Sequence, residues 1–332
     1  MPKVHAATLY RQIFKHGSLK PWLAVDLPQK LIQCLQQDPF AISPPKVAQL
    51  QESAYDGSVK FVFQFHDGQQ IESVLMPEKR RLTACLSTQV GCRQACVFCH
   101  TGRMGLKRQL TAAEIVGQVF VLEQWLRENQ SWLSKQSLPL QQRVSNVVFM
   151  GMGEPLDNVD QVIAAIEVMN DPLGFNLPLR KISVSTAGHL DGLLEITKQL
   201  PQVRLALSLH APNDTERSRL LPINRRWPLG VLMDFFRHRA PSIKHHLLVQ
   251  YTVIKGVNDS FRHAREMGEL LQGIPSKINL IPLNPIGLSR LQSPEAEALQ
   301  AFRHYLQEQG FRVLVRYSKG QDIAAACGQL VQ

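Results

Sequence analysis

From about residue 81 onward, short apolar runs alternate with stretches in which apolar residues recur at helical spacing. Such alternation is typical of repeated strand–helix units around a parallel sheet. FRVLVRY is a further strand candidate beside the six main ones, which are RLTACLS, SNVVFM, RKISVST, VRLALSL, LLVQYTVI and KINLIPL. About six units are too few to close an eight-stranded barrel, and consecutive parallel units curl the same way. We therefore predict an α/β fold with an incomplete (βα)6-type barrel rather than an open doubly wound sheet, with its chemistry at the carboxyl ends of the strands.

Helix starts between these strands are marked by recognisable signals. Thr111 precedes Glu114 by three residues, which is the spacing of a capping box, and apolar residues follow at Ile115, Val119 and Leu122. A helix is therefore predicted to begin at this point. Further helices are predicted to begin near Leu190, Pro228, Ser260 and Pro294.

The first 80 residues follow different patterns. Residues 1–50 contain short helical segments broken by prolines, without a period that defines a large core. In residues 51–80, apolar and polar positions alternate around Asp56-Gly57 and Asp67-Gly68, which are turn pairs of β-hairpins. We therefore divide the chain into a small helical appendage (1–50), a β-hairpin element (51–80) and the partial barrel with a C-terminal tail (81–332).

The balance of charge narrows the range of partners. The chain has 37 basic and 27 acidic residues, a net charge of +10. An excess of this size favours polyanionic partners such as nucleic acid, although a solvated basic surface explains it equally well. The N-terminal residues lack the apolar core of a signal peptide, and no stretch approaches the roughly 18 apolar residues of a membrane span. A cytoplasmic protein without a membrane partner is expected.

Six cysteines in such a compartment are poor candidates for structural disulfides. Three of them form the run Cys92-Arg-Gln-Ala-Cys96-Val-Phe-Cys99, in the loop after the first predicted barrel strand. Three thiolates at this spacing can bind one face of a cubic iron–sulfur cluster and leave the fourth iron without a protein ligand. The alternative is a zinc site with Cys85 or His100 as fourth ligand, although the second ligand pair usual for zinc is missing.

A glycine-rich turn follows the second predicted barrel strand, in the sequence Met150-Gly-Met-Gly-Glu-Pro155. Glycines allow backbone groups to approach a ligand, and the carboxylate of Glu154 can bind an ammonium group. Taken alone, such a turn is more often a tight connection between strand and helix.

Together these segments resemble the RlmN/Cfr family of radical S-adenosylmethionine (SAM) RNA methyltransferases, which methylate C2 or C8 of an adenine. The resemblance runs from about residue 70 to residue 330, and the N-terminal segment, a region that helps bind RNA in the family, departs from the pattern. The matching segments are CLSTQVGCRQACVFCHTG, GLKRQLTAAEIVGQV, NVVFMGMGEPLDN, SVSTAG, LSLHAPND, LLPIN, VNDS, KINLIPLNP and DIAAACGQL.

The resemblance implies a set of cofactors and ligands. A [4Fe-4S] cluster would be held by Cys92, Cys96 and Cys99, and its free iron would chelate the amino and carboxylate groups of SAM. One electron would then split the sulfonium to give a 5′-deoxyadenosyl radical. The residues that would contact SAM are Gly153, Glu154, Ser185, Ser208, Leu209, His210 and Asn284.

Catalytic roles follow from the same resemblance. Cys327 would accept a methyl group from a first SAM, and a second SAM would supply the radical that activates this S-methyl group for addition to the adenine carbon. Cys85 would break the resulting RNA adduct and form a disulfide with Cys327. Glu72 matches a proton acceptor of the family, although an exposed strand residue explains it equally well.

The expected partners are 23S ribosomal RNA and/or tRNA, together with an electron donor such as a flavodoxin-type reductase system, and a monomer is expected. No residue separates C2 from C8 methylation; C2 is favoured as the housekeeping activity. Two alternatives remain open: another radical SAM reaction on RNA, such as methylthio transfer, and a non-catalytic zinc- or RNA-binding protein.

Basic and histidine side chains complete the candidate residues. We expect His245, His246, His263 and His304 to be solvated or hydrogen-bonded, because they lack metal-ligand spacing. A phosphate-binding rim is predicted from Arg93, Arg103, Lys107, Arg108, Arg217, Arg219, Arg225 and Arg226.

Overall fold

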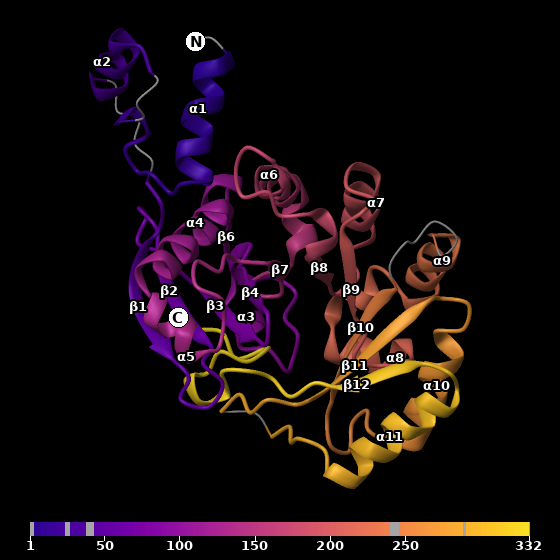
Figure 1. Cartoon of the computed structure of the whole chain (residues 1–332). Helices are drawn as coiled ribbons and strands as arrows, with labels where there is room; N and C mark the ends of the chain where they lie inside the picture. The colour runs from indigo at the N-terminus through magenta and orange to yellow at the C-terminus, as the bar shows by residue number, and fades with distance from the viewer. Residues whose placement is uncertain (1–2, 24–26, 38–42, 240–245, 288–289, 332) are drawn as a thin grey trace.

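One ten-stranded sheet organises the chain, in the order β1-β2-β3-β4-β7-β8-β9-β10-β11-β12 (Figure 1). The structure is a computed structural model that describes residues 3–23, 27–37, 43–239, 246–287 and 290–331. The strands of this sheet are β1 (Lys46–Glu52), β2 (Val59–Gln64), β3 (Gln70–Glu78), β4 (Arg81–Cys85), β7 (Asn146–Phe149), β8 (Ile182–Thr186), β9 (Arg204–Ser208), β10 (Leu247–Val253), β11 (Ser276–Pro282) and β12 (Arg312–Val315).

The sheet is parallel from β4 through β12. Each parallel strand coincides with one of the runs predicted from sequence, although β11 begins one residue earlier than its run, and the further candidate FRVLVRY forms β12. Within the described residues, β1 and β12 are the two edges and do not pair with each other, so the sheet stays open. The prediction of an incomplete barrel is confirmed.

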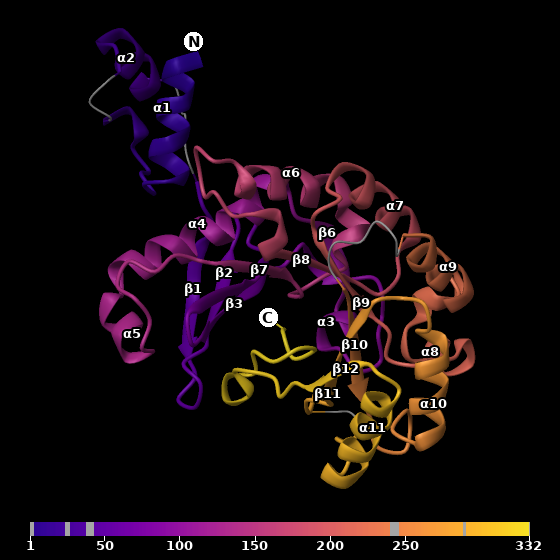
Figure 2. The same ribbon diagram turned by 45° about the vertical axis from the view of Figure 1, so that its right-hand side comes forward.

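Helices pack on the outer face of the curved sheet (Figures 1 and 2). Thr111 caps α4 through the predicted capping box with Glu114. The four helices predicted near Leu190, Pro228, Ser260 and Pro294 begin within two residues of those positions, because the signals at these starts are local. The helices of the main body are α3 (His100–Arg103), which lies inside the curve beside β5 (Figure 2), and α4 (Ala112–Glu128), α5 (Gln130–Lys135), α6 (Val159–Asn170), α7 (Leu190–Gln199), α8 (Asp214–Leu220), α9 (Leu229–Arg239), α10 (Phe261–Leu270) and α11 (Ala296–Glu308). Short 3-10 turns lie at Pro21–Leu23, Pro155–Asn158, Leu179–Lys181, Pro222–Arg225 and Gln321–Ile323.

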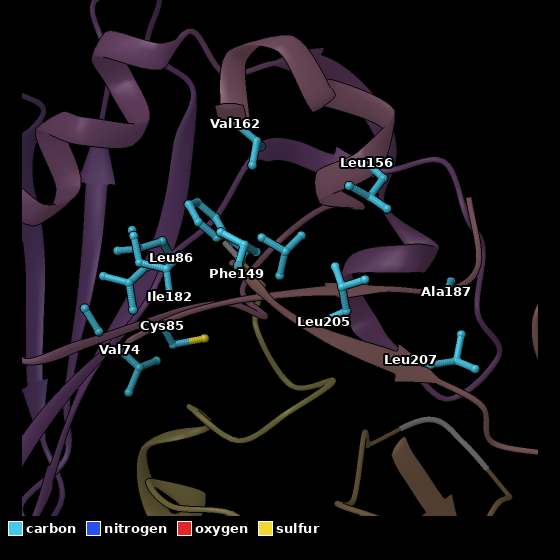
Figure 3. Close-up of a cluster of buried hydrophobic side chains, with 14 of the residues drawn as sticks. Val74, Cys85, Leu86, Phe149, Leu156, Val162, Ile182, Ala187, Leu205 and Leu207 are labelled. Carbon is cyan, nitrogen blue, oxygen red and sulfur yellow. The ribbon is translucent and has the colours of Figure 1, made fainter. Parts of the chain in front are cut away.

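Apolar side chains fill the space between the parallel strands and these helices. Figure 3 shows part of this core, in which Phe149, Ile182 and Leu205 come from three neighbouring strands and Val162 comes from α6. All four side chains are buried. The described helices include none that is both long and apolar enough to cross a membrane.

Strands β1 to β3 extend the parallel sheet as an antiparallel meander. The predicted turn pairs lie between these strands, where Gly57 and Gly68 have φ of +70° and +77°. A residue with a β-carbon is strained at such angles, which explains the glycines. Strand β1 begins at Lys46, within the range assigned to the helical appendage, and the division of the chain into three domains stays a prediction.

Helices α1 (Lys3–Phe14) and α2 (Gln29–Gln37) project from the barrel beyond α4 and α6 (Figure 2). Contacts at the end of α1 attach this pair to the main body. Phe14 lies 5.5 Å, between ring centroids, from Phe175. Arg127 at the end of α4 donates hydrogen bonds to the carbonyl oxygens of His16 and Lys15 at 2.9 and 3.0 Å.

The C-terminal segment 316–331 crosses the open side of the sheet from β12 to β1–β3 (Figure 1). Gly320 N donates to the Asp56 carboxylate at 2.8 Å, and Ser53 Oγ donates to Asp322 at 2.7 Å. The backbone N–H of Val331 donates to Glu72 at 2.7 Å. This segment, the tail, therefore joins the two edges of the open sheet.

Candidate active site at the carboxyl ends of the strands

A cavity of about 170 Å³ lies at the carboxyl ends of the parallel strands. It combines residues from the cysteine loop, from the loops after β7 and β9, from the inner faces of β8 to β10 and from the tail. The cavity brings together most of the residues predicted from sequence, namely Cys92, Cys96, Cys99, Gly153, Glu154, Ser185, Ser208, His210, Asn284 and Cys327.

A small second sheet positions the three cysteines of the loop. It pairs β5 (Gln89–Cys92) with β6 (Gly105–Gln109), and neither strand was predicted. Cys92 ends β5, and Cys99 precedes α3. A β-carbon on Gly102 would lie 2.9 Å from Cys96 N, so the loop packs tightly on this short helix.

Burial raises the pKa of all three loop thiols, and the neighbouring thiol of Cys99 adds to the rise at Cys92 and Cys96. The thiols are therefore protonated without a metal, and metal binding would release their protons. Among the described residues, no three His, Cys, Asp or Glu side chains converge closely enough to hold one metal ion. In a cubic cluster each iron takes its own thiolate, so three thiols lining one cavity from separate positions fit a [4Fe-4S] group.

The fourth ligands considered for zinc lie elsewhere. Neither Cys85 nor His100 is among the residues that line this cavity. The ring Nε2 of His100 lies 3.0 Å from the Ile286 carbonyl oxygen, and its backbone N–H donates to Gly328 O at 2.8 Å. His100 therefore joins the cysteine loop to the tail, a role for which the sequence held no signal.

The glycine-rich turn brings a buried carboxylate to the cavity. Gly153 has φ of +102°, and a β-carbon there would lie 2.6 Å from Gln89, so only glycine fits. The Glu154 carboxylate accepts hydrogen bonds from Ala187 N at 2.8 Å and Leu156 N at 3.2 Å. Burial nevertheless raises the pKa of Glu154 to about 7. A buried carboxylate held in this way can pair with the ammonium group of a ligand.

Polar side chains from β8 and β9 line the next part of the cavity. Ser185 and Ser208 lie with their hydroxyl oxygens 3.4 Å apart. His210 follows with φ of +56°, and its Nδ1 accepts a hydrogen bond from Thr252 N at 2.9 Å. Burial, assisted by nearby Arg217, lowers the pKa of His210 to about 3. The imidazole is therefore neutral at physiological pH, with its proton on Nε2.

Leu209 lies between these residues but does not line the cavity. Its side chain is fully buried in the apolar core, and its backbone N–H donates to Gln250 O at 2.9 Å. Side chains alternate between the two faces along an extended segment, which explains why Leu209 faces away from Ser208, the last residue of β9.

Arg217 does not belong to an exposed rim, so this part of the sequence prediction is wrong. Its side chain is fully buried, and its guanidinium donates to the carbonyl oxygens of Leu209, Ala187 and Ser208 at 3.0, 2.6 and 3.0 Å. A further donation reaches Asn224 Oδ1 at 2.7 Å. Arg217 therefore satisfies backbone carbonyls just beyond the ends of β8 and β9.

Other predicted rim residues differ in how far their charge is already paired. Arg108 contacts both Asp67 and Glu114, at 2.6 and 2.8 Å. Arg93 lies 3.2 Å from Asp157, and Arg226 lies 3.3 Å from Asp191. The remaining predicted rim residues are exposed: Arg103, Lys107, Arg219 and Arg225.

Three of the other histidines can be placed. His263 bonds Glu216 and Ser260, His304 contacts Glu308 on the helix surface, and His246 is exposed. His245 lies outside the described residues.

The tail brings Cys327 to the cavity, and Asn284 fixes the backbone there. Asn284 Nδ2 donates to Cys327 O at 3.0 Å and to Ser318 Oγ at 2.9 Å. Gly328 has φ of +82°, and a β-carbon at this position would lie 3.0 Å from the Phe98 carbonyl oxygen. The thiol of Cys327 is free and its side chain is exposed.

Cys85 lines a second, smaller cavity of about 30 Å³, which also contains Cys327. Figure 3 shows the Cys85 sulfur on the side of the strands where the tail runs. Burial raises the pKa of Cys85 to about 12; Cys327 adds to this rise and Arg316 opposes it. Cys327 and Arg316 line both cavities, so the two spaces adjoin at these residues.

Glu72 lines neither cavity. Its carboxylate contacts Lys60 Nζ at 3.1 Å and accepts the hydrogen bond from Val331 N. Burial raises the pKa of Glu72, and Lys60 opposes this rise. In this arrangement Glu72 holds the end of the tail.

Sequence reasoning missed several residues of the cavity wall, including Phe98, Gln250, Thr252 and Arg316. Gln250 carried a signal, since it is a glutamine in the largely apolar run LLVQYTVI. Arg316 follows β12 and carried none.

Several known proteins resemble this chain in sequence and in fold. A model of the radical SAM superfamily matches residues 86–267, from the cysteine loop to α10. The probable dual-specificity RNA methyltransferase RlmN 1 of Protochlamydia amoebophila is 39% identical over 328 residues, covering 98% of this chain and 87% of that protein. The dual-specificity RNA methyltransferase RlmN of Pseudomonas putida is 43% identical over 297 residues, covering 87% of this chain and 74% of its own length.

The chain belongs to the RlmN/Cfr family of radical SAM enzymes. A crystal structure of a radical SAM methyltransferase from Sphaerobacter thermophilus superposes on it with a TM-score of 0.90 at 37% identity, covering 99% of this chain and 93% of that one. The resemblance based on the cysteine run and its companion motifs is thus confirmed. Membership in RlmN/Cfr implies SAM and a [4Fe-4S] cluster as cofactors.

Proposed function

We propose that this protein methylates an adenine carbon of RNA, with C2 favoured over C8, and that Cys327 carries the methyl group. The observation that carries this proposal is that Cys327 lines both the cavity of the cluster cysteines and the smaller cavity of Cys85. A thiol at this junction can meet SAM on one side and a resolving thiol on the other. The relatives named above are RNA methyltransferases, which supports RNA as the substrate.

Residues of the larger cavity would hold the cofactors. Cys92, Cys96 and Cys99 would bind the cluster, while Glu154 would pair with the SAM amino group. Bound there, the cluster and SAM supply a one-electron cleavage that yields a carbon radical able to remove a hydrogen atom. Two SAM molecules would be used per turnover, one as methyl donor and one as radical source.

The two cysteines of the smaller cavity perform the remaining covalent steps. The Cys327 thiolate would attack the methyl carbon of a bound SAM, forming a sulfur–carbon bond as the sulfonium–methyl bond breaks and S-adenosylhomocysteine leaves. After the methylene carbon has been joined to RNA, the Cys85 thiolate would attack the Cys327 sulfur. The sulfur–carbon bond would break with its electron pair passing to the carbon, which takes up a proton and becomes the methyl group on RNA. The product is a Cys85–Cys327 disulfide, which an external thiol or reductase reopens.

The proton-acceptor role implied for Glu72 requires the tail to move. In the structure, one oxygen of its carboxylate accepts a hydrogen bond from Val331 N and the other forms an ion pair with Lys60. Release of Val331 would free one oxygen to accept a proton. Glu72 would then act after the tail has shifted.

RNA would approach over the exposed basic residues Arg103, Lys107, Arg219 and Arg225. An adenine must leave its stack to enter the cavity, which favours a loop in 23S ribosomal RNA or tRNA. A flavodoxin-type reductase system would supply electrons, and the protein would act as a monomer in the cytoplasm.

The decisive experiment compares cysteine variants of the anaerobically reconstituted enzyme. Ribosomal RNA and tRNA are incubated with SAM and a reductant, and their nucleosides are analysed by mass spectrometry. Wild type should form 2-methyladenosine, Cys327→Ala should form none, and Cys85→Ala should accumulate protein covalently bound to RNA. The exposed Cys34 provides the matched control, since Cys34→Ala should behave as wild type.

Other outcomes distinguish the alternatives. Formation of 8-methyladenosine would show that C8, and not C2, is the carbon that is methylated. Turnover by Cys327→Ala at the wild-type rate would refute the methyl-carrier role. Purified protein that contains zinc but no iron or sulfide would favour the alternative of a non-catalytic zinc- or RNA-binding protein. Methylthio transfer normally needs cysteines for a second cluster, and the region before the cluster motif offers only Cys34 and Cys85.

A further inference from the structure

Gln250 carries an unsatisfied amide into the larger cavity. Its side chain is 5% exposed, and neither Nε2 nor Oε1 has a hydrogen-bond partner among the residues that the structure describes. Buried amides in folded proteins are nearly always hydrogen-bonded, because leaving them unpaired costs free energy. The carboxamide therefore requires a partner that is not part of the described protein.

The sheet fixes the direction in which this amide points. Gln250 lies on β10 opposite Ser208 of β9, and both side chains line the cavity. The next residue, Tyr251, faces the other side of the sheet, where its ring packs on Phe302 of α11 and its hydroxyl donates to Asn258 O at 2.8 Å. Strand alternation thus directs Gln250 inward.

The surrounding chemistry matches a purine. Phe98, Ile281 and Leu283 supply apolar walls to the same cavity. A carboxamide offers one donor and one acceptor in a plane, which pair with the 6-amino group of adenine and with either N1 or N7 beside it. The ammonium and carboxylate groups of an amino-acid ligand would instead bind charged side chains, such as Glu154 for the ammonium group.

We propose that the Gln250 carboxamide recognises an adenine ring in this cavity through paired hydrogen bonds. The inference rests on the proposed function, which brings two adenines to this space, one in SAM and one in RNA. The same hydrogen bonds would recognise either adenine, and the experiment below distinguishes the adenine of SAM from the adenine of RNA.

The test removes the amide and the 6-amino group separately. In one arm, calorimetry measures binding of 5′-deoxyadenosine and of the matching 5′-deoxypurine riboside, which lacks the 6-amino group, to the anaerobic holoenzyme. In the other arm, fluorescence anisotropy measures binding of an RNA oligonucleotide with adenosine or purine riboside at the target position. Wild type and Gln250→Leu are compared in both arms.

We expect wild type to prefer the adenine ligand about tenfold in one arm, and Gln250→Leu to lose that preference. Loss in the nucleoside arm assigns the contact to SAM, and loss in the RNA arm assigns it to the target base. Gln250→Glu keeps the acceptor for the 6-amino group and loses the donor to the ring nitrogen, so it should retain the preference while binding both ligands more weakly. Equal preference by wild type and Gln250→Leu in both arms would overturn the inference.

Controls separate this contact from folding and from the proposed reaction. Gln199→Leu makes the same substitution on the outer surface of α7 and should leave both preferences unchanged. Iron content and thermal melting check that Gln250→Leu is folded and loaded. Neither arm requires turnover, so a failure to form methyladenosine would count against the proposed function while the nucleoside arm still decides the role of Gln250.

Discussion

The carboxylate of Glu72 accepts a hydrogen bond from the backbone N–H of Val331 at 2.7 Å, which ties the end of the tail to β3. Lys60 on β2 contacts the other oxygen at 3.1 Å, and both side chains are almost completely buried. The ion pair and the tail contact therefore share one carboxylate, and substitutions can separate their contributions.

Glu72→Gln should lower the free energy of unfolding by about 3–5 kcal/mol, because Lys60 would remain buried without a counter-charge. Lys60→Met combined with Glu72→Gln removes both charges and should recover most of this loss. Urea unfolding of the cluster-free protein measures both effects. A double variant as unstable as Glu72→Gln would show that the buried ion pair is not the cause.

The same carboxylate should control exchange of the tail amides with solvent. In the Lys60→Met background, Glu72→Leu removes the acceptor of Val331 N–H without leaving a buried charge, whereas Glu72→Gln keeps an acceptor. Hydrogen exchange at Val331 should therefore be faster in the leucine variant. Equal exchange rates in the two variants would mean that other contacts hold the tail.

The pH dependence of stability should reveal two opposing buried groups in the cluster-free protein. The pKa of Glu154 is raised to about 7, so its stabilising contribution is complete below its ordinary value of 4.5 and is lost as pH rises through 7. The pKa of His210 is lowered to about 3, so the folded state binds fewer protons and gains stability as pH rises from 3 to 6.5. Between pH 4.5 and 6.5 the two effects oppose each other.

Relative to wild type, Glu154→Gln should therefore shift the slope of stability against pH upward in this window, by up to about 1.4 kcal/mol per pH unit. Urea unfolding at several pH values measures the slope. Glu128 on α4 is exposed, and Glu128→Gln should leave the wild-type slope in place. Parallel slopes for wild type and Glu154→Gln would contradict the raised pKa of Glu154.

Arg217 should matter for stability rather than for contact with phosphate. Arg217→Met leaves three buried carbonyl groups and Asn224 without their donor, and we expect a loss of about 3 kcal/mol or more. Arg219 lies on the same helix and is exposed, so Arg219→Met should stay within about 0.5 kcal/mol of wild type. Similar stabilities for the two variants would refute this assignment.

The salt dependence of RNA binding should distinguish exposed from paired cations. Lys107→Gln or Arg225→Gln should reduce the slope of log binding constant against log salt concentration by about 0.7–0.9 each, because a phosphate contact is lost. Arg108→Gln should change the slope less, since Asp67 and Glu114 already pair with this guanidinium. Fluorescence anisotropy at several salt concentrations measures the slopes, and the largest change at Arg108 would reverse the interpretation.

Local signals explain why much of the fold could be predicted. Apolar strand runs and the Thr111–Glu114 capping box act through neighbouring residues, and their elements formed where expected. The pairing of β5 with β6 could not be predicted, because these strands are short and flank the cysteine loop. The path of the tail also depends on contacts with distant residues such as Asp56.

The site shows the same division between local and distant causes. The cysteine run and the glycine-rich turn were visible as spacings, and their residues line one cavity. Arg217 was misassigned because arginine is usually exposed, whereas here several backbone carbonyls compensate for its burial. Leu209 was grouped with its neighbours, although alternation turns its side chain into the core.

The tail is attached to both edges of the open sheet, and Cys327 lies between these attachments. Asn284, which follows β11, holds the Cys327 carbonyl, and Glu72 on β3 holds Val331, so a change in the separation of these strands would move Cys327 relative to Cys85 on β4. If RNA becomes bonded to Cys327 as proposed, the tail links the substrate to both edges of the sheet. The strain on this link then depends on how far the two edges lie apart. Breaking the bond between Cys327 and RNA would then end this link as well as release the product.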